Sequence, residues 1–156
     1  MQLLIVRHGE SPPAPQSGVA SDAERSLSEK GRQDITTLAN KLRRDDLKPE
    51  LILSSPLRRA WETAGIVAAV FSPPTPLKKL PALASGASPT ELAKAIEWEI
   101  SDKNYRFIVL TGHQPQLGAF ISWLTQSPAP PLAPGSCAAV EYRGPHVSQF
   151  LWVHHP

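Results

Sequence analysis

The sequence contains a single cysteine, Cys137, so no disulfide can form within the chain. It has no apolar run near the roughly 18 residues of a membrane-spanning helix, and no signal-peptide pattern stands at its start. Basic residues exceed acidic residues by only two, 16 against 14, and so small an excess does not indicate nucleic-acid binding. We therefore expect a cytoplasmic protein that binds neither nucleic acid nor membranes.

The 156 residues have an ordinary globular composition, 41% hydrophobic and 19% charged. A chain of this length suits one domain, here residues 1–156, and it can bury enough surface to be stable without disulfides. The sequence has no internal repeat, and its 17 prolines cluster in the expected connections. The apolar neighbours of Cys137 predict a small buried thiol.

A short apolar run, Leu3-Leu4-Ile5-Val6, ends abruptly in Arg7, His8 and Gly9. Such a run is typical of a buried strand in a parallel sheet. Ligands of open α/β sheets bind beyond the carboxyl ends of the strands, so Arg7 and His8 lie where chemistry is expected. Gly9 lacks a side chain at a place where a ligand can approach closely. The alternative interpretation is an ordinary polar strand end on the surface.

A second apolar strand, Leu51-Ile52-Leu53, is followed by Ser55 as helix N-cap and Pro56 as the first helical residue. This places Arg58 and Arg59 in the first turn of the helix. Cations there oppose the helix dipole, so the pair is unfavourable unless an anion is bound. A helix N-terminus with an arginine beside it is a site for anions.

A third strand, Phe107–Leu110, ends in Gly112 and His113, which repeats the pattern of the first strand. A lone histidine is more often structural, but two histidines and an arginine beyond neighbouring strands can converge on one pocket. Helical periodicity and a capping box at Ser88 predict further helices over 28–44 and 88–102. The pattern at the end of the chain predicts a β-hairpin over 136–153.

Together these elements predict an α/β fold with three layers. A mostly parallel central sheet carries helices on both faces, and the C-terminal hairpin adds an antiparallel edge. Residues 11–27 form a long loop by composition, and a loop of that length is usually functional or mobile. The loop contains Arg25. The alternative interpretation of this residue is a solvated loop charge with no role in a site.

Four motifs, spread over residues 7 to 115, resemble those of the histidine phosphatase superfamily, which has the phosphoglycerate-mutase-like fold. The motifs are Arg7-His8-Gly9-Glu10, Arg25-Ser26-Leu27-Ser28-Glu29-Lys30-Gly31, Ser55-Pro56-Leu57-Arg58-Arg59-Ala60-Trp61-Glu62-Thr63 and Gly112-His113-Gln114-Pro115. They occur in the family's order. The short chain, with no large insertion before His113, is most similar to the SixA-type phosphohistidine phosphatases.

The resemblance implies that His8 is the nucleophile and forms a covalent phosphohistidine, while Arg7, Arg59 and His113 bind the phosphoryl group. Arg59 is preferred over its neighbour because the family arginine directly precedes the alanine of this motif. Arg25 assists from the loop, and Gly9 belongs to the binding motif. The implied substrate is a phosphorylated protein, with phosphohistidine on a phosphotransfer domain as the target and inorganic phosphate as the product.

We expect neither metal nor cofactor, because the arginines supply positive charge and no carboxylate cluster suited to Mg²⁺ stands in the sequence. Many relatives use a glutamate as general acid for the leaving group. This sequence departs from the family at that position, because Ala82 aligns with the glutamate. Glu10, Asp22 and Glu24 are possible substitutes, and nothing local favours one of them. A missing acid favours phosphohistidine over alkyl phosphates as substrate.

Three other functions fit parts of this pattern. A small phosphomonoester is a possible substrate within the same superfamily, whereas mutase activity is disfavoured because the chain is too short for a lid. A non-catalytic module that binds phosphorylated proteins is compatible with the missing acid but does not need both histidines. A metal hydrolase using His8, Glu10 and His113 lacks the P-C-x-x-C partner of the zinc deaminases.

Overall fold

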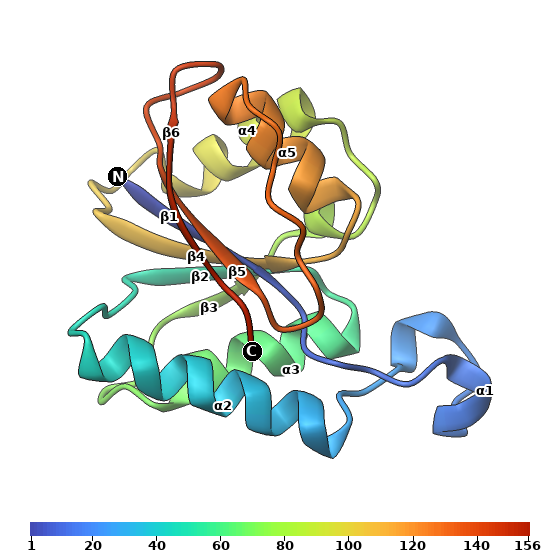
Figure 1. Ribbon diagram of the computed structural model, residues 1–156. Coiled ribbons are helices and arrows are strands. Elements are labelled where there is room, and N and C mark those ends of the chain that lie inside the picture. Colours follow the sequence, from blue (N-terminus) through green and yellow to red (C-terminus); the bar gives the residue numbers. More distant parts are fainter.

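The computed structural model describes residues 1–156, apart from the side chain of Ser17. Its centre is a six-stranded sheet with the order β3-β2-β4-β1-β5-β6 (Figure 1). The strands are β1 (Gln2–Arg7), β2 (Leu51–Ser54), β3 (Leu77–Lys79), β4 (Phe107–Gly112), β5 (Cys137–Glu141) and β6 (Gln149–His154). The first four strands of the order are mutually parallel, whereas β5 pairs antiparallel with β1, and β6 pairs antiparallel with β5. The predicted mostly parallel sheet with an antiparallel C-terminal edge is therefore confirmed.

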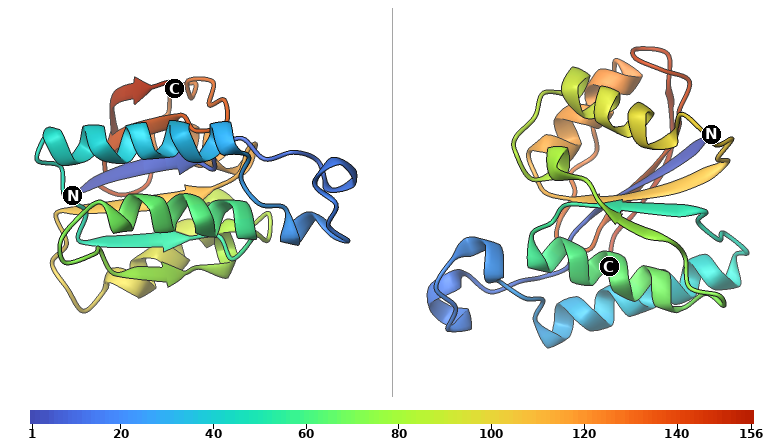
Figure 2. Two further views of the ribbon diagram at one scale, coloured as in Figure 1. Left: turned by 90° about the horizontal axis from the view of Figure 1, so that it is seen from below. Right: turned by 180° about the vertical axis from the view of Figure 1, so that it is seen from behind.

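Helices cover both faces of the sheet, as Figures 1 and 2 show. On one face lie α2 (Glu29–Arg44) and α3 (Arg58–Ala69), and on the other α4 (Pro89–Ile100) and α5 (Gln116–Thr125). Successive side chains of β1 point to opposite faces, so Leu3 and Ile5 pack in the core beneath α4 and α5. Leu4 and Val6 pack in the core beneath α2 and α3. All four are fully buried, which explains why the sequence shows an unbroken apolar run.

Two of the expected helix starts are confirmed by their caps. The side chain of Ser28 accepts a hydrogen bond from the Gly31 backbone N–H at the start of α2. Ser88 and Glu91 form the predicted capping box of α4. These caps satisfy backbone donors that the first helical turn leaves unpaired.

The predicted start of α3 is wrong by two residues. Leu57, and not Ser55, is the N-cap, because it keeps an extended conformation with ψ 137°. The Ser55 hydroxyl instead accepts a hydrogen bond from the Leu57 backbone N–H at 3.2 Å. Arg58 and Arg59 remain in the first turn, so their expected position is confirmed.

The segment 11–27 leaves the carboxyl edge of the sheet and extends away from the rest of the molecule (Figure 2). It contains the short helix α1 (Ala14–Ser17) and the 3₁₀ turn η1 (Asp22–Glu24). A second 3₁₀ turn, η2 (Pro81–Leu83), follows β3. Within the described part of the chain, no helix has the length and apolarity needed to cross a membrane.

Candidate active site

The ends of three neighbouring strands lie level with one another at one edge of the sheet. Arg7 of β1 pairs with Gly112 of β4, and Ser54 of β2 pairs with Thr111 of β4. The ladder continues one residue further, since the His8 backbone N–H donates to the Gly112 carbonyl at 3.0 Å. Side chains that follow these strands are therefore brought together, as expected for the carboxyl edge of a parallel sheet.

The rings of His8 and His113 are close neighbours, with centroids 5.2 Å apart. Nδ1 of His8 lies 2.7 Å from the Gly9 carbonyl oxygen. A carbonyl only accepts hydrogen bonds, so Nδ1 must carry the proton and donate it. The other nitrogen, Nε2, then has a free lone pair, and it accepts a hydrogen bond from Nε of Arg59 at 3.3 Å. Nε2 is thus the nitrogen of His8 whose lone pair is available.

Both histidines have a lowered pKa. Burial lowers the pKa of His8 from 6.5 to about 4, the hydrogen bond to the Gly9 carbonyl opposes this shift, and the electrostatic influence of His113 and of the Arg59 and Arg7 cations adds to it. Burial likewise lowers the pKa of His113 to about 4, followed by the charge of Arg59, while Asp22 opposes the shift. Both imidazoles are therefore neutral near pH 7 in the free protein, and a neutral imidazole is the form that can attack.

The two arginines of the α3 first turn have different environments. Arg59 is buried, with 7% of its surface exposed, and its guanidinium reaches His8. Arg58 is exposed and pairs with Glu62 one turn further along the helix at 2.8 Å. This contrast supports Arg59 as the arginine of the site.

Two nitrogen atoms in the site have no hydrogen-bond partner. Among the buried side-chain nitrogens and oxygens of the described residues, only Nε of Arg7 and Nδ1 of His113 lack one. Another nitrogen of Arg7, Nη1, donates to the Leu132 carbonyl at 2.9 Å and so anchors the side chain. A buried unpaired donor costs about 1–3 kcal/mol, so the site is suited to a ligand with several acceptor oxygens.

Ser55 is the hydrogen-bond partner of Nε2 of His113, and its hydroxyl oxygen lies 2.7 Å from that nitrogen. The same oxygen accepts from the Leu57 backbone N–H, and its own proton is available for donation to Nε2. In the tautomer that accepts this proton at Nε2, Nδ1 of His113 carries a proton that a ligand oxygen can accept. Sequence analysis assigned Ser55 only a capping role, although its position directly after β2 is the same signal that marks His8.

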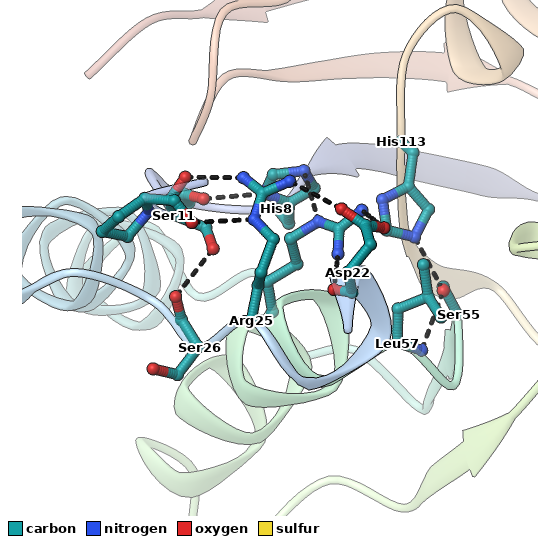
Figure 3. A network of polar contacts seen from close by, with 11 residues as sticks. His8, Ser11, Asp22, Arg25, Ser26, Ser55, Leu57 and His113 are labelled. Carbon is teal, nitrogen blue, oxygen red and sulfur yellow. Dashed lines mark hydrogen bonds and ion pairs between the residues drawn. The ribbon is translucent and has the colours of Figure 1, made fainter. Parts of the chain in front are cut away.

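Arg25 contributes to the site indirectly. Its guanidinium donates to the backbone carbonyls of Ser11 and Pro12 at 2.7 and 2.8 Å, and to Oδ1 of Asp22 at 2.9 Å. Asp22 in turn contacts Arg59, whose Nη1 and Nη2 reach the Asp22 carbonyl at 2.9 Å and Oδ2 at 3.1 Å. Figure 3 shows Asp22 between Arg25 and His113. Arg25 therefore braces the loop and Asp22, and its role in substrate binding stays a prediction.

The structure gives a packing reason for the glycine at position 9. A Cβ atom on Gly9 would lie 2.9 Å from the Gly31 carbonyl oxygen and 3.0 Å from the Ile35 side chain. The close neighbour of the missing side chain is therefore α2, and the approach of a ligand to Gly9 stays a prediction. The backbone of Gly9 nevertheless belongs to the site, because its carbonyl orients His8 and its N–H donates to Oγ1 of Thr63 at 3.1 Å.

A hollow of about 270 Å³ opens beside Arg59 and His113. Its lining residues are Asp22, Leu57, Arg59, Leu83, Ala84, Gly86, His113, Gln114, Pro115 and Gln116. Asp22 is the only carboxylate in this lining. Ala82 is not part of the lining, since its side chain packs against the core beneath α4 and α5. In the described residues, no three His, Cys, Asp or Glu side chains gather closely enough to hold a metal ion.

Comparison with known proteins identifies the family. The sequence model of the histidine phosphatase superfamily (branch 1) matches residues 3–86, and the chain belongs to this superfamily. An uncharacterized protein of Picosynechococcus sp. (strain ATCC 27264 / PCC 7002 / PR-6) is 36% identical over 118 residues, which cover 76% of this chain and 69% of that protein. Phosphohistidine phosphatase SixA of Escherichia coli (strain K12) is 27% identical over 139 residues, covering 89% of this chain and 83% of SixA.

A structure of the protein histidine phosphatase SixA complexed with tungstate has the same fold. It matches with a TM-score of 0.86 and 23% identity, over 100% of this chain and 97% of that one. The predicted phosphoglycerate-mutase-like α/β fold is confirmed, and the protein is a SixA-like phosphatase. Because the protein is a phosphatase, the alternative function of a non-catalytic binding module is disfavoured.

Proposed function

We propose that this protein hydrolyses phosphohistidine on a partner protein through a covalent intermediate at Nε2 of His8. The observation that carries this proposal is the hydrogen bond from Nδ1 of His8 to the Gly9 carbonyl. It leaves Nε2 as a neutral nucleophile that needs no base to remove a proton before attack. A covalent intermediate divides one difficult displacement into two easier ones.

The groups around His8 suit a phosphoryl group in transfer. Such a group carries negative charge on three equatorial oxygens, and catalysis depends mainly on positioning and on neutralising that charge. Arg59 has N–H groups beyond those that contact His8 and Asp22, and guanidinium forks match phosphoryl oxygens. The unpaired Nε of Arg7 is a further buried donor, and the unpaired Nδ1 of His113 is another in the tautomer that accepts from Ser55 at Nε2. We assign these three residues to binding the phosphoryl group.

The same hydrogen bond prepares the second step. When the phosphoryl group is on Nε2, the proton on Nδ1 makes the ring of His8 an imidazolium cation. A cationic ring departs as neutral imidazole once water attacks phosphorus, and the electron pair of the broken P–N bond returns to Nε2. The Gly9 carbonyl stabilises this proton throughout, so His8 is ready for the next cycle.

The wall of the hollow supports phosphohistidine over other substrates. Leu83, Ala84 and Gly86 line it from the side of η2, and none of them can donate a proton to a leaving group or bind a second charged group. An alkoxide needs such a proton, and a general acid is worth about 10²–10⁴ in rate. A phosphohistidine can be protonated from water on its free ring nitrogen and then leaves as neutral imidazole. The curated relative named phosphohistidine phosphatase adds to this support.

The proposal is tested by comparing substrates. A phosphotransfer domain carrying phosphohistidine should have a kcat/KM about 100-fold or more above those of alkyl phosphomonoesters, and His8→Ala should abolish turnover of both. A small phosphomonoester is the second candidate, because a hollow of about 270 Å³ can admit one. If one such ester were turned over faster than the phosphorylated domain, the protein substrate would be rejected.

A further inference from the structure

Asp22 holds a position in the site that the family motifs do not assign. Its carboxylate lies between two guanidinium groups, with Oδ1 2.9 Å from Nη1 of Arg25 and Oδ2 3.1 Å from Nη2 of Arg59. The Asp22 carbonyl also accepts from Arg59 at 2.9 Å. Its side chain remains 63% exposed, in contrast to 8% for that of Arg59. The carboxylate is therefore fixed in place but open to water.

The side of the site on which Asp22 lies is the side from which water must attack. In an in-line displacement the entering and leaving groups stand on opposite sides of phosphorus. With the phosphoryl group on Nε2 of His8, the water enters opposite His8. Arg59 and His113, which flank His8, line the hollow, whereas His8 itself does not. The hollow is thus the approach for water, and Asp22 stands in its wall.

The other two acidic residues near the loop are placed differently. Oε1 of Glu10 accepts from the Ser28 hydroxyl at 3.1 Å, at the start of α2. Glu24 follows Asp22 in the same 3₁₀ turn and is likewise exposed. Neither residue lines the hollow beside His113. Geometry therefore selects Asp22 among the three acids that the sequence left open.

We propose that Asp22 is the catalytic base of the second step and accepts a proton from the water that hydrolyses the phosphorylated His8. The water oxygen forms a bond to phosphorus, and the bond between phosphorus and Nε2 breaks, with its electron pair returning to Nε2. One water proton passes to the Asp22 carboxylate. The products are neutral His8, hydrogen phosphate and protonated Asp22, which then loses its proton to solvent. This inference rests on the phosphoenzyme route of the proposed function.

The charges around Asp22 suit it to accept a proton in the second step but not to donate one in the first step. The hydrogen bond from Arg25, and then the charge and hydrogen bond of Arg59, hold the pKa of the Asp22 carboxyl below its usual value. Near neutral pH it is ionised and can accept a proton in the second step. It carries no proton to give to a leaving group in the first step. The same residue thus supports hydrolysis of the phosphoenzyme while leaving the enzyme without an acid for alkyl esters.

The test separates the two steps with p-nitrophenyl phosphate, whose leaving group needs no acid. Asp22→Asn retains an oxygen acceptor for the arginines but cannot take a proton. It should release a burst of p-nitrophenol equal to the enzyme present, followed by turnover about 100-fold slower than that of wild type. Acid-labile phosphate on the protein should accumulate during this slow phase. Glu24→Gln, which changes an acid in the same turn outside the hollow, should behave like wild type.

A second variant distinguishes the loss of a base from a structural effect of the substitution. Asp22→Ala should also show the burst, and added formate should restore its slow phase in part, because a free carboxylate can replace the missing base. Three results would overturn the proposal: an undiminished slow phase in Asp22→Asn, a loss of the burst itself, or no response of Asp22→Ala to formate. Absence of acid-labile phosphate in every variant and in wild type would instead reject the phosphoenzyme route, and this proposal with it.

Discussion

Nε of Arg59 lies 3.3 Å from Nε2 of His8. This contact joins the first turn of α3 to the end of β1, two elements 51 residues apart in the sequence. It places a permanent cation beside Nε2, the nitrogen that we propose as nucleophile, and helps to hold the imidazole neutral. Because a phosphoryl group on Nε2 would lie next to the same guanidinium, the cation of the free site is in position to bind the transferred group.

Arg59→Ala should reduce kcat/KM by about 10²–10³-fold or more, the usual loss when a positioned donor to the transition state is removed. Arg58→Ala should reduce it far less, because Arg58 is exposed and pairs with Glu62, and such an exposed ion pair contributes little to the stability of the fold. Steady-state kinetics of the two single variants measure the difference, and thermal unfolding verifies that both remain folded. Equal losses would show that the phosphate-binding arginine is misassigned.

A general acid can be restored in the wall of the hollow. Ala84 lines the hollow, so Ala84→Glu should raise kcat/KM for an alkyl phosphomonoester more than for phosphohistidine, by about 10-fold or more. Ala82→Glu is the matched control, because the side chain at that position packs against the core. The ratio of the two kcat/KM values is compared across wild type and both variants. An unchanged substrate preference in Ala84→Glu would mean that another residue already supplies the proton.

The free energy of unfolding should depend on the two site histidines at mildly acidic pH. Burial lowers their pKa from 6.5 to about 4 in the folded protein. Between these values the unfolded chain binds more protons than the folded one, so stability should fall as pH falls from about 6.5 towards 4. Above pH 6.5 both states are neutral at these residues, and the effect disappears.

Urea unfolding between pH 7.5 and 4.5 measures this dependence in the absence of phosphate. His113→Asn removes one of the two histidines, so its stability should decline less steeply over the same range. The carboxylates that titrate nearby are common to both proteins and cancel in the comparison. Identical slopes for wild type and variant would show that His113 is not held neutral by the fold.

The sequence predicted the parts of the site that depend on local order along the chain. His8 and His113 each follow an apolar strand, and Arg59 stands in a first helical turn where a cation needs an anion. The ends of these strands lie level in the sheet, so three local signals were sufficient to place one pocket. The fold class followed from the same alternation of strands and helices.

Other parts of the site depend on contacts that no local pattern records. Asp22 reaches Arg59 because of the path of the loop that carries it, and its neighbours in sequence give no sign of this. Ser55 meets His113 because Leu57 stays extended and delays the start of α3. The absent side chain of Gly9 is explained by the approach of α2, a tertiary contact, although the sequence suggested a ligand.

The most direct test of the account is the identity of the phosphorylated atom during turnover. Wild-type enzyme is mixed with p-nitrophenyl phosphate and quenched rapidly, and the phosphorylated residue is located by mass spectrometry and its isomer by NMR. The account predicts acid-labile, base-stable phosphate on Nε2 of His8, and none in His8→Ala. Phosphate on Nδ1 of His8, or acid-stable phosphate on Ser11, Ser55 or Thr111, would contradict it.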